Sequence, residues 1–455
     1  MGGLRIKQIV NIDVDGKIAV QKRYYYSENK GYSELSQGSG VLKGKPSYSV
    51  IYKLGDIASV EMASEGGYFP ELVNQISPEV GYSCVIEETL DSLGHSCGYV
   101  KYHYTNYDSD IYGMSHMDEH FLYSCNISGE SSLLPFTSNS AERGKLLSKE
   151  FYNSDGKLLR TEKIKYKRVG EKSFKTATQN VIYFSTDPGS YLDAKVGWVT
   201  KTHTYSYLPV STKVTEYNDG IPYVCEQRKG YDEDKFLTCD SCLTSSGKWL
   251  SRNYFYPKNF TCYKWMLDKH TISPIVRNEK KCGYETLYEI NTYFPKNGIP
   301  YLKKKQIGHD ERWLNTKYEI TKVDAYLNPI EIKQKGETSV LVWGGSGQKL
   351  IARFDNVTYK QMNELLGKDV LSFSKMSMDK IDYEPLLNVR SLLPQTLSTI
   401  YMYDSALRLV SVTKNTGFTN YYSYDLLDRL REEYFFDEEG NKQILRQYDY
   451  NYISK

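Results

Sequence analysis

Apolar and polar residues alternate with a period of two over many short stretches of the chain, which is typical of β-strands. In 163–167 the three lysines fall on one face of such a strand, and Ile164 and Tyr166 fall on the other. Gly and Asn tolerate the left-handed backbone of tight turns, and we predict turns at Asp15-Gly16, Asp155-Gly156, Asp219-Gly220, Asn297-Gly298 and Glu439-Gly440-Asn441. The pattern predicts an all-β fold of consecutive antiparallel hairpins in an extended, curved repeat sheet.

One stretch departs from this pattern and predicts helices. Thr358 and Gln361 fit a capping box, and Gly367 is a suitable helix end. A second helix is predicted from Ser377 to Leu393, ended by Pro394, although Pro385 fits poorly inside it. We therefore expect a helical insert at 357–394, between a hairpin region at 1–200, a central hairpin region at 201–356 and C-terminal repeats at 395–455.

Composition narrows the class of protein. The chain has 455 residues, and its 58 Lys and Arg against 56 Asp and Glu give a net charge of +2, which argues against a nucleic-acid binder. No apolar run approaches the ~20 residues of a spanning helix, so we expect no membrane span. Tyr is unusually frequent, with 43 residues against 15 Phe, and this suits strands whose hydroxyls stay hydrated.

The C-terminal region contains a repeat. Tyr403-Asp404 recurs as Tyr424-Asp425 and as Tyr448-Asp449, and an Arg follows the first two Asp residues by four. We interpret each copy as a strand that ends in Tyr, a turn whose Asp carboxylate accepts backbone N–H groups, and a return strand that begins with Arg. The predicted structural residues of the repeat are Tyr403, Asp404, Arg408, Tyr424, Asp425, Arg429, Gly440, Tyr448 and Asp449.

The segment Tyr424–Leu430 resembles the YD repeat of rearrangement-hotspot (RHS) proteins, Tyr-Asp-x-x-Gly-Arg-Leu. Leu407 and Asp428 stand where that repeat has Gly, so we expect those turns to be of another type. Further blocks resemble large YD-repeat surface proteins of Bacteroidota: Gly2–Lys7, Tyr104–Asp108, Met117–Glu119, Glu142–Leu147, Tyr205–Val210, Val342–Gln348 and Ala352–Tyr359.

This resemblance implies a β-repeat architecture. It also implies a C-terminal portion or truncated relative of a longer exported protein, at the cell surface or secreted. The N-terminal residues carry no signal-peptide pattern, so we expect the export signal to lie upstream. The toxin-enclosing shell of the large family members is not implied, because their self-cleaving core and toxin domain are not recognisable here.

Two motifs have metal-binding patterns. His116, Glu119 and His120 match HxxEH, whose chemistry needs a helix that places both histidines on one face. The flanks show no helical stripe, so a polar loop is favoured and a metal-dependent hydrolase is the alternative. Asp13 and Asp15 match the first half of a calcium loop, but the twelfth position is Lys22. This favours a turn, with a weak calcium site as the alternative.

The cysteines and the remaining histidines show no ligand pattern. Cys239 and Cys242 form a CxxC without the second close pair that a zinc site needs, and their flanks are typical of hairpin arms. Eight cysteines are too few for a disulfide scaffold. No cofactor or metal is predicted, and we interpret the remaining histidines as structural or exposed: His95, His103, His203, His270 and His309.

Two surface features remain. The lysines at 303–305 and at 157–175 are interpreted as solvated strand faces, because Glu162 and Glu171 interrupt the second run. Tyr24 and Tyr26 lie on one face of a predicted strand and Tyr25 on the other, so some tyrosines must be exposed and could stack on sugars. The sequence thus predicts a non-enzymatic structural or adhesive segment. Its partners would be cell-surface glycans or other proteins, and a carbohydrate-binding module is the alternative.

Overall fold

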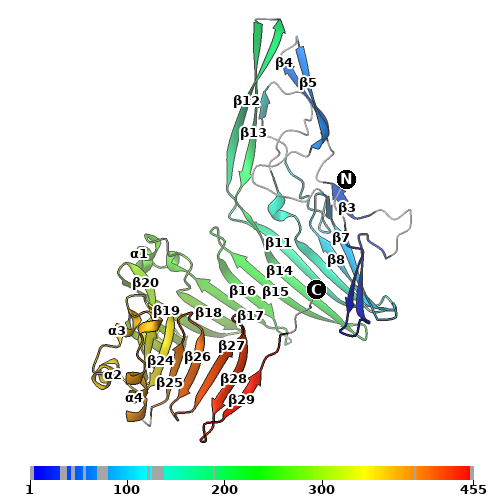
Figure 1. Ribbon diagram of the computed structural model, residues 1–455. Coiled ribbons are helices and arrows are strands. Elements are labelled where there is room, and N and C mark those ends of the chain that lie inside the picture. Colours follow the sequence, from blue (N-terminus) through cyan, green and yellow to red (C-terminus); the bar gives the residue numbers. More distant parts are fainter. Residues whose placement is uncertain are drawn as a thin grey trace. The chain divides into compact units, whose positions relative to one another are not determined.

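The computed structural model describes residues 5–30, 38–42, 47–54, 58–68, 80–119, 123–125, 138–187, 190–244, 246–393 and 396–450. The chain divides into two compact units, Met1–Asn253 and Tyr254–Lys455. Both are built mainly from antiparallel strands that follow one another along the chain (Figure 1). The predicted all-β class of consecutive hairpins is confirmed.

The first unit contains a ladder in which each strand pairs antiparallel with the next. Its last strand runs two residues past the boundary of the unit. The strands in order are β1 (Gln8–Ile12), β2 (Ile18–Tyr25), β7 (Cys84–Leu90), β8 (Ser96–Tyr104), β10 (Leu146–Tyr152), β11 (Leu158–Val169), β14 (Ser206–Asn218), β15 (Ile221–Tyr231), β16 (Leu237–Leu243) and β17 (Trp249–Phe255).

Further elements are inserted between these ladder strands. The hairpin of β12 (Ser173–Asp187) and β13 (Ser190–His203) connects β11 to β14, which nevertheless pair with each other. The other insertions are β3 (Gly40–Leu42) with β6 (Val80–Tyr82), β4 (Ser47–Leu54) with β5 (Ala58–Tyr68), β9 (Tyr123–Cys125) and the 3-10 turn η1 (Ser140–Glu142).

The second unit begins with short helical turns and continues as a ladder. The turns are η2 (Pro257–Asn259), η3 (Thr261–Tyr263) and α1 (Lys264–Leu267). The strands are β18 (Arg277–Cys282), β19 (Glu285–Lys296), β20 (Ile299–Asp310), β21 (Trp313–Val323), β22 (Pro329–Gln334), β23 (Glu337–Gly344), β24 (Lys349–Asp355), β25 (Ser398–Tyr403), β26 (Leu409–Lys414), β27 (Thr419–Tyr424), β28 (Leu430–Phe436) and β29 (Lys442–Gln447).

The predicted helical insert connects β24 to β25 and consists of α2 (Tyr359–Leu366), α3 (Leu371–Ser374), η4 (Met378–Lys380) and α4 (Glu384–Leu392) (Figure 1). The capping box of Thr358 and the left-handed Gly367 at the end of α2 are confirmed. The single helix predicted from Ser377 to Leu393 is wrong. A 3-10 turn precedes α4, and Pro385 lies in the first turn of α4, where its missing N–H costs no hydrogen bond.

The largest hydrophobic core of the described residues lies between these helices and the strands before and after them. Phe354 of β24, Phe373 of α3 and Leu386 of α4 are fully buried in one cluster. Ile351 and Ile400 join it from the paired strands β24 and β25. The insert therefore supplies the second layer that a single sheet lacks.

Several local predictions are confirmed. On β11 the three lysines at 163, 165 and 167 are exposed, whereas Ile164 and Tyr166 are half-buried. The segment 344–347 turns the hairpin between β23 and β24. Cys239 and Cys242 lie on the hairpin strand β16. Within the described residues, no helix is both long and apolar enough to cross a bilayer.

Candidate functional site

The repeat region is organised by one five-residue turn. The N–H of Asp404 donates to the carbonyl of Arg408, and the N–H of Leu407 donates to the carbonyl of Asp404, each at 3.0 Å. In the described part of the chain the same pair of bonds recurs in eleven turns, whose first residues are Asp13, Asp91, Asp110, Asn153, Asp232, Thr244, Asp324, Asp404, Lys414, Asp425 and Asp437.

The carboxylate of the first residue caps the turn. Asp425 Oδ1 accepts the backbone N–H groups of Leu427 at 2.9 Å and Arg429 at 3.0 Å. The Arg429 side chain, together with these N–H groups, holds the pKa of Asp425 below its ordinary value. The side-chain oxygen of the first residue accepts the same two backbone bonds in the turns that begin at Asp13, Asp91, Asp110, Asp324 and Asp437, and at Asn153 the acceptor is the amide oxygen.

The fourth residue of the turn is left-handed whether or not it is Gly. Leu407 has φ 63°, Asp428 has φ 60° and Gly440 has φ 81°. The expectation of a different turn type at Leu407 and Asp428 is therefore wrong, because the backbone of both residues adopts the left-handed conformation that Gly usually takes. Hydrogen bonds around each turn offset a strain of roughly 1–2 kcal/mol where the left-handed residue is not Gly.

In two places of the repeat region a tyrosine hydroxyl bonds the backbone of the preceding strand. Tyr424 Oη donates to the carbonyl of Leu409 at 2.9 Å, and the Arg408 guanidinium lies over the Tyr424 ring. Tyr450 Oη donates to the carbonyl of Leu430 at 2.9 Å, with the Arg429 guanidinium 4.0 Å from its ring centre. We call this contact the tyrosine latch.

The latch shifts the position of the predicted third copy of the repeat. Tyr450 makes the contacts of Tyr424, so the third copy is centred two residues beyond the predicted Tyr448 and Asp449. Predicted Gly440 is the fourth residue of the turn that begins at Asp437. Predicted Tyr403 packs against the helical-insert core, and the guanidinium of Arg408 returns to Asp404 at 2.7 Å, as that of Arg429 returns to Asp425 at 2.8 Å.

Sequence reasoning missed the earlier copies of this arrangement. Tyr231 precedes the turn at Asp232, and its hydroxyl donates to the carbonyl of Pro209 at 3.2 Å. The strands between turns differ in length, so no fixed period connects Tyr231 to Tyr424. The sequence signal that the copies share is an apolar residue followed by Asp, with a second apolar residue five positions after the Asp.

His116 of the HxxEH motif belongs to a buried hydrogen-bond network. His116 is fully buried, with Nδ1 2.7 Å from Glu142 Oε2 and Nε2 3.0 Å from Asp110 Oδ2. Glu142 Oε1 also accepts from Arg168 Nε at 2.5 Å and from Tyr205 Oη at 2.6 Å. Both ring nitrogens of His116 are occupied by carboxylates, so neither is available to a metal ion in this arrangement.

Charge in this network is stabilised by its partners. Burial opposes the imidazolium, but hydrogen bonds to Glu142 and Asp110 outweigh it and raise the pKa of His116. Burial likewise opposes the Glu142 carboxylate, but hydrogen bonds from His116, Tyr205 and Arg168 lower the pKa of Glu142 to about 2. Glu119 lies 3.7 Å from His203 Nε2, and predicted His120 lies outside the described residues.

The predicted calcium-loop residues form a turn. Asp13 Oδ1 accepts the backbone N–H groups of Asp15 at 3.0 Å and Lys17 at 2.8 Å. Gly16 supplies the left-handed fourth position. This geometry matches the other five-residue turns, and the turn interpretation holds.

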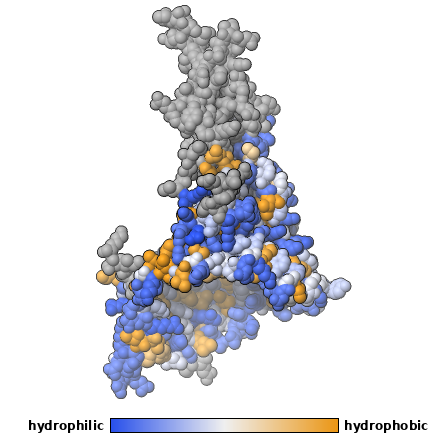
Figure 2. All heavy atoms as spheres, turned by 90° about the vertical axis from the view of Figure 1, so that its right-hand side faces the viewer, coloured by the Kyte–Doolittle hydropathy of each residue, from blue (hydrophilic) through white to orange (hydrophobic). Residues whose placement is uncertain are grey.

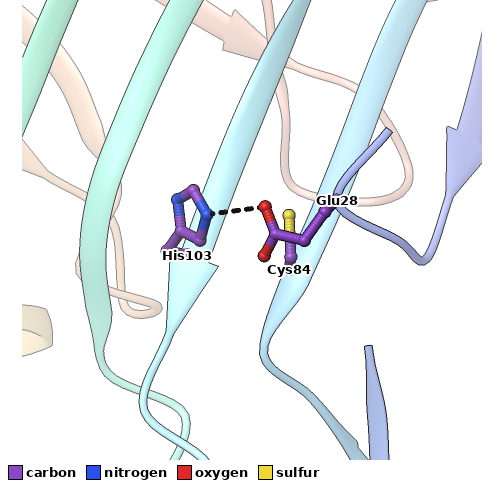
Figure 3. Close-up of side chains that lie close together, drawn as sticks. All are labelled: Glu28, Cys84 and His103. Atoms are coloured by element: carbon purple, nitrogen blue, oxygen red, sulfur yellow. Dashed lines mark hydrogen bonds and ion pairs between the residues drawn. The ribbon is translucent and has the colours of Figure 1, made fainter. Parts of the chain in front are cut away.

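A mixed group of potential metal ligands lies elsewhere in the first unit. Glu28, Cys84 and His103 point toward one another from the segment after β2, from β7 and from β8 (Figure 3). Their potential ligand atoms lie within 4.8 Å of one another. Among the residues that the structure describes, this is the one group of three that meets this distance. No spacing in the sequence joins these three residues. His103, which the sequence predicts to be structural or exposed, is mostly buried and lies 2.9 Å from Ser148 Oγ through its Nδ1.

Burial controls the ionisation of this group. Burial, and next the nearby Glu28 charge, raises the pKa of the fully buried Cys84 thiol to about 12. Burial opposes the Glu28 charge as well, but Lys101 and His103 lower the pKa of that carboxyl. The thiols that the structure describes are free: Cys84, Cys97, Cys225, Cys239, Cys242, Cys262 and Cys282.

Among known proteins, this chain is similar to solved structures. No family model matches the chain, and no curated protein matches it. A crystal structure of TcdB2-TccC3 without the hypervariable C-terminal region is 9% identical with a TM-score of 0.28, over 96% of this chain and 18% of that one. A crystal structure of TcdB2-TccC3-TEV is 10% identical with a TM-score of 0.24, over 81% and 26%.

The Photorhabdus luminescens Tc holotoxin pore with a TccC3 mutation is 9% identical with a TM-score of 0.25, over 81% of this chain and 26% of that one. This chain thus spans between 18% and 26% of the length of these three structures.

Proposed function

We propose that this chain is a non-enzymatic structural or adhesive β-repeat segment of an RHS/YD-repeat type of exported protein. The observation that carries the proposal is the combination of the five-residue turn with the tyrosine latch. The hydroxyls of Tyr424 and Tyr450 donate to backbone carbonyls of the neighbouring strand. The guanidinium groups of Arg408 and Arg429 donate to the Asp carboxylates of their turns. The repeat residues hold strands together.

The charged network around His116 supports the same proposal. Its carboxylates and its imidazole are paired with one another and are buried. A general base or a nucleophile needs an open position next to the substrate, whereas His116 and Glu142 are enclosed. This network therefore serves to hold η1, β11 and the turn at Asp110 together.

Two measurements test this function. Surface labelling of intact producer cells with an antibody against the chain should detect it outside the cell, and purely intracellular signal contradicts the proposal. The full chain should also show no hydrolysis of a panel of peptide, ester and glycoside substrates. Turnover that Glu119→Gln abolishes, and that the matched Glu171→Gln leaves intact, would establish the hydrolase alternative instead.

A glycan-binding role is the second candidate, and one hollow of the second unit favours it. The hollow has a volume of about 570 Å³ and combines three tyrosines with charged residues: Tyr424, Asp425, Arg429, Arg431, Tyr448, Asp449 and Tyr450. Arg429 covers one face of the Tyr450 ring, so Tyr448 is the better stacking surface. On the face that Figure 2 shows, hydrophobic residues form separate groups among hydrophilic ones.

A glycan array with the full chain tests this second role. Tyr448→Ala should reduce binding to any glycan that is recognised at the hollow, because aromatic stacking is lost. Tyr284→Ala is the matched control, since Tyr284 is fully exposed and does not line the hollow. Binding that both variants leave unchanged rules out the hollow as a glycan site.

A further inference from the structure

We propose that Cys84, His103 and Glu28 form a binding site for a transition-metal ion of the zinc class. Thiolate, imidazole and carboxylate are the three side-chain ligands that Zn²⁺ takes in proteins. Three protein ligands leave a fourth tetrahedral position for water. This site lies apart from the HxxEH motif and from the CxxC of Cys239 and Cys242.

The sheet itself sets the distance between two of the ligands. Cys84 of β7 and His103 of β8 are direct partners in the antiparallel register. Directly opposed residues place their Cβ atoms about 4.5–5.5 Å apart on one face of a sheet. Thiol and imidazole are therefore held together by backbone pairing, before any ion binds.

A second residue orients the imidazole. Ser148 of β10 is the register partner of His103 on its other side, and Ser148 Oγ lies 2.9 Å from His103 Nδ1. The opposite nitrogen, Nε2, faces Glu28 Oε2 at 3.4 Å (Figure 3). Metal-bound histidines usually make such a hydrogen bond through the nitrogen that does not bind the ion.

The third ligand gives the ion a way in. The Glu28 side chain is 59% exposed, whereas that of His103 is 12% exposed and Cys84 is fully buried. Lys101 Nζ lies 2.5 Å from Glu28 Oε2 and is the cation that an incoming ion must displace. Its flexible stem can carry the ammonium to solvent. The thiol proton also leaves to solvent as the metal–sulfur bond forms.

Titration of the metal-free full chain with ZnCl₂ in a calorimeter tests the site. We expect one ion per chain at this site, with proton release seen as a dependence of the heat on the buffer. Bound Co²⁺ should show a thiolate charge-transfer absorption. Absence of stoichiometric binding to the folded chain overturns the proposal.

Variants locate the ion. Glu28→Gln changes an exposed side chain, so this variant should fold, and we expect its affinity for Zn²⁺ to be at least tenfold weaker. Cys84→Ser should remove the Co²⁺–thiolate absorption band. Ser148→Ala should weaken binding about tenfold. The matched controls are Cys97→Ser and His95→Gln, which alter exposed residues of the same β7–β8 hairpin. Binding that Glu28→Gln leaves intact, or that Cys242→Ser abolishes, overturns the assignment.

Discussion

Individual residues in this protein accept backbone strain where a turn requires it. Asp219, Asn297 and Lys335 each begin a two-residue turn with positive φ, followed by a Gly that also has positive φ. Asn suits this position, whereas Lys has no side-chain compensation there. The strain at Lys335 is therefore a local weakness between β22 and β23.

Lys335→Asn should stabilise the chain by about 1 kcal/mol, because Asn adopts the left-handed backbone at lower cost. Lys335 is exposed, so the substitution removes little packing. Urea unfolding of both proteins measures the difference. Lys317→Asn is the matched control on strand β21, where Asn has no advantage, and an equal gain there would contradict the explanation.

The ionisation of His116 makes the stability of the folded chain depend on pH. Its folded pKa is raised, so its contribution to stability is fully present below the unfolded value of about 6.5 and is lost as pH rises through the folded pKa. His116→Gln should cost about 3 kcal/mol below that pH, because it removes the charged partner of buried Glu142 and Asp110. Unfolding free energies across pH measure both effects.

The control for this prediction is His95→Gln, because His95 is an exposed turn residue. That variant should keep the decline of stability with rising pH, and His116→Gln should lose the part that His116 causes. Parallel pH profiles for the wild type and His116→Gln would contradict the role of the buried network.

At the scale of elements, the tyrosine latch bonds Tyr424 and Tyr450 to the backbone of the strand before each of them. Tyr424→Phe removes one hydrogen bond to the Leu409 carbonyl and should destabilise the chain by about 1 kcal/mol. Tyr284→Phe should be neutral, because Tyr284 is fully exposed. Chemical unfolding compares the two, and equal stabilities of the Tyr424 and Tyr284 variants would show that the latch contributes nothing.

The helical insert is the other stabilising device at this scale. Phe354→Ala should cost about 3–5 kcal/mol, because it leaves a cavity among α3, α4 and their strands. Hydrogen exchange should speed up in β23, β24 and α4. Phe436→Ala is the matched control, since Phe436 is half-exposed, and an equal loss of protection in both variants would contradict the assignment of the core.

At the scale of the whole molecule, alternation and turn residues were enough to predict the class of fold. The sequence predicts a strand at 163–167, and this segment lies within β11, because period-two alternation of polar and apolar residues indicates which face is buried. The left-handed backbone of Leu407 in the predicted turn after Asp404 was not predictable, since local hydrogen bonds there outweigh the intrinsic preference of Leu. The segment before α4 was mispredicted because helical spacing of apolar residues continues through Pro385.

The candidate sites depended on pairing between distant strands. Nothing in the sequence near Cys84 indicates His103, since their contact follows from the β7–β8 register. His116 likewise lies within hydrogen-bond distance of Glu142 because the folded chain brings η1 next to it. Register is set jointly by many side chains, so proximity of this kind comes from the folded chain.

The pairing of β24 with β25 has a practical consequence. Phe354 lies opposite Ser398 and Ala352 lies opposite Ile400, although the whole insert intervenes. A long excursion thus leaves the alignment of the two flanking strands intact, since loop closure costs free energy that grows only slowly with length. Exposed hairpin ends, such as Glu438–Glu439, are accordingly suitable graft points for foreign peptides.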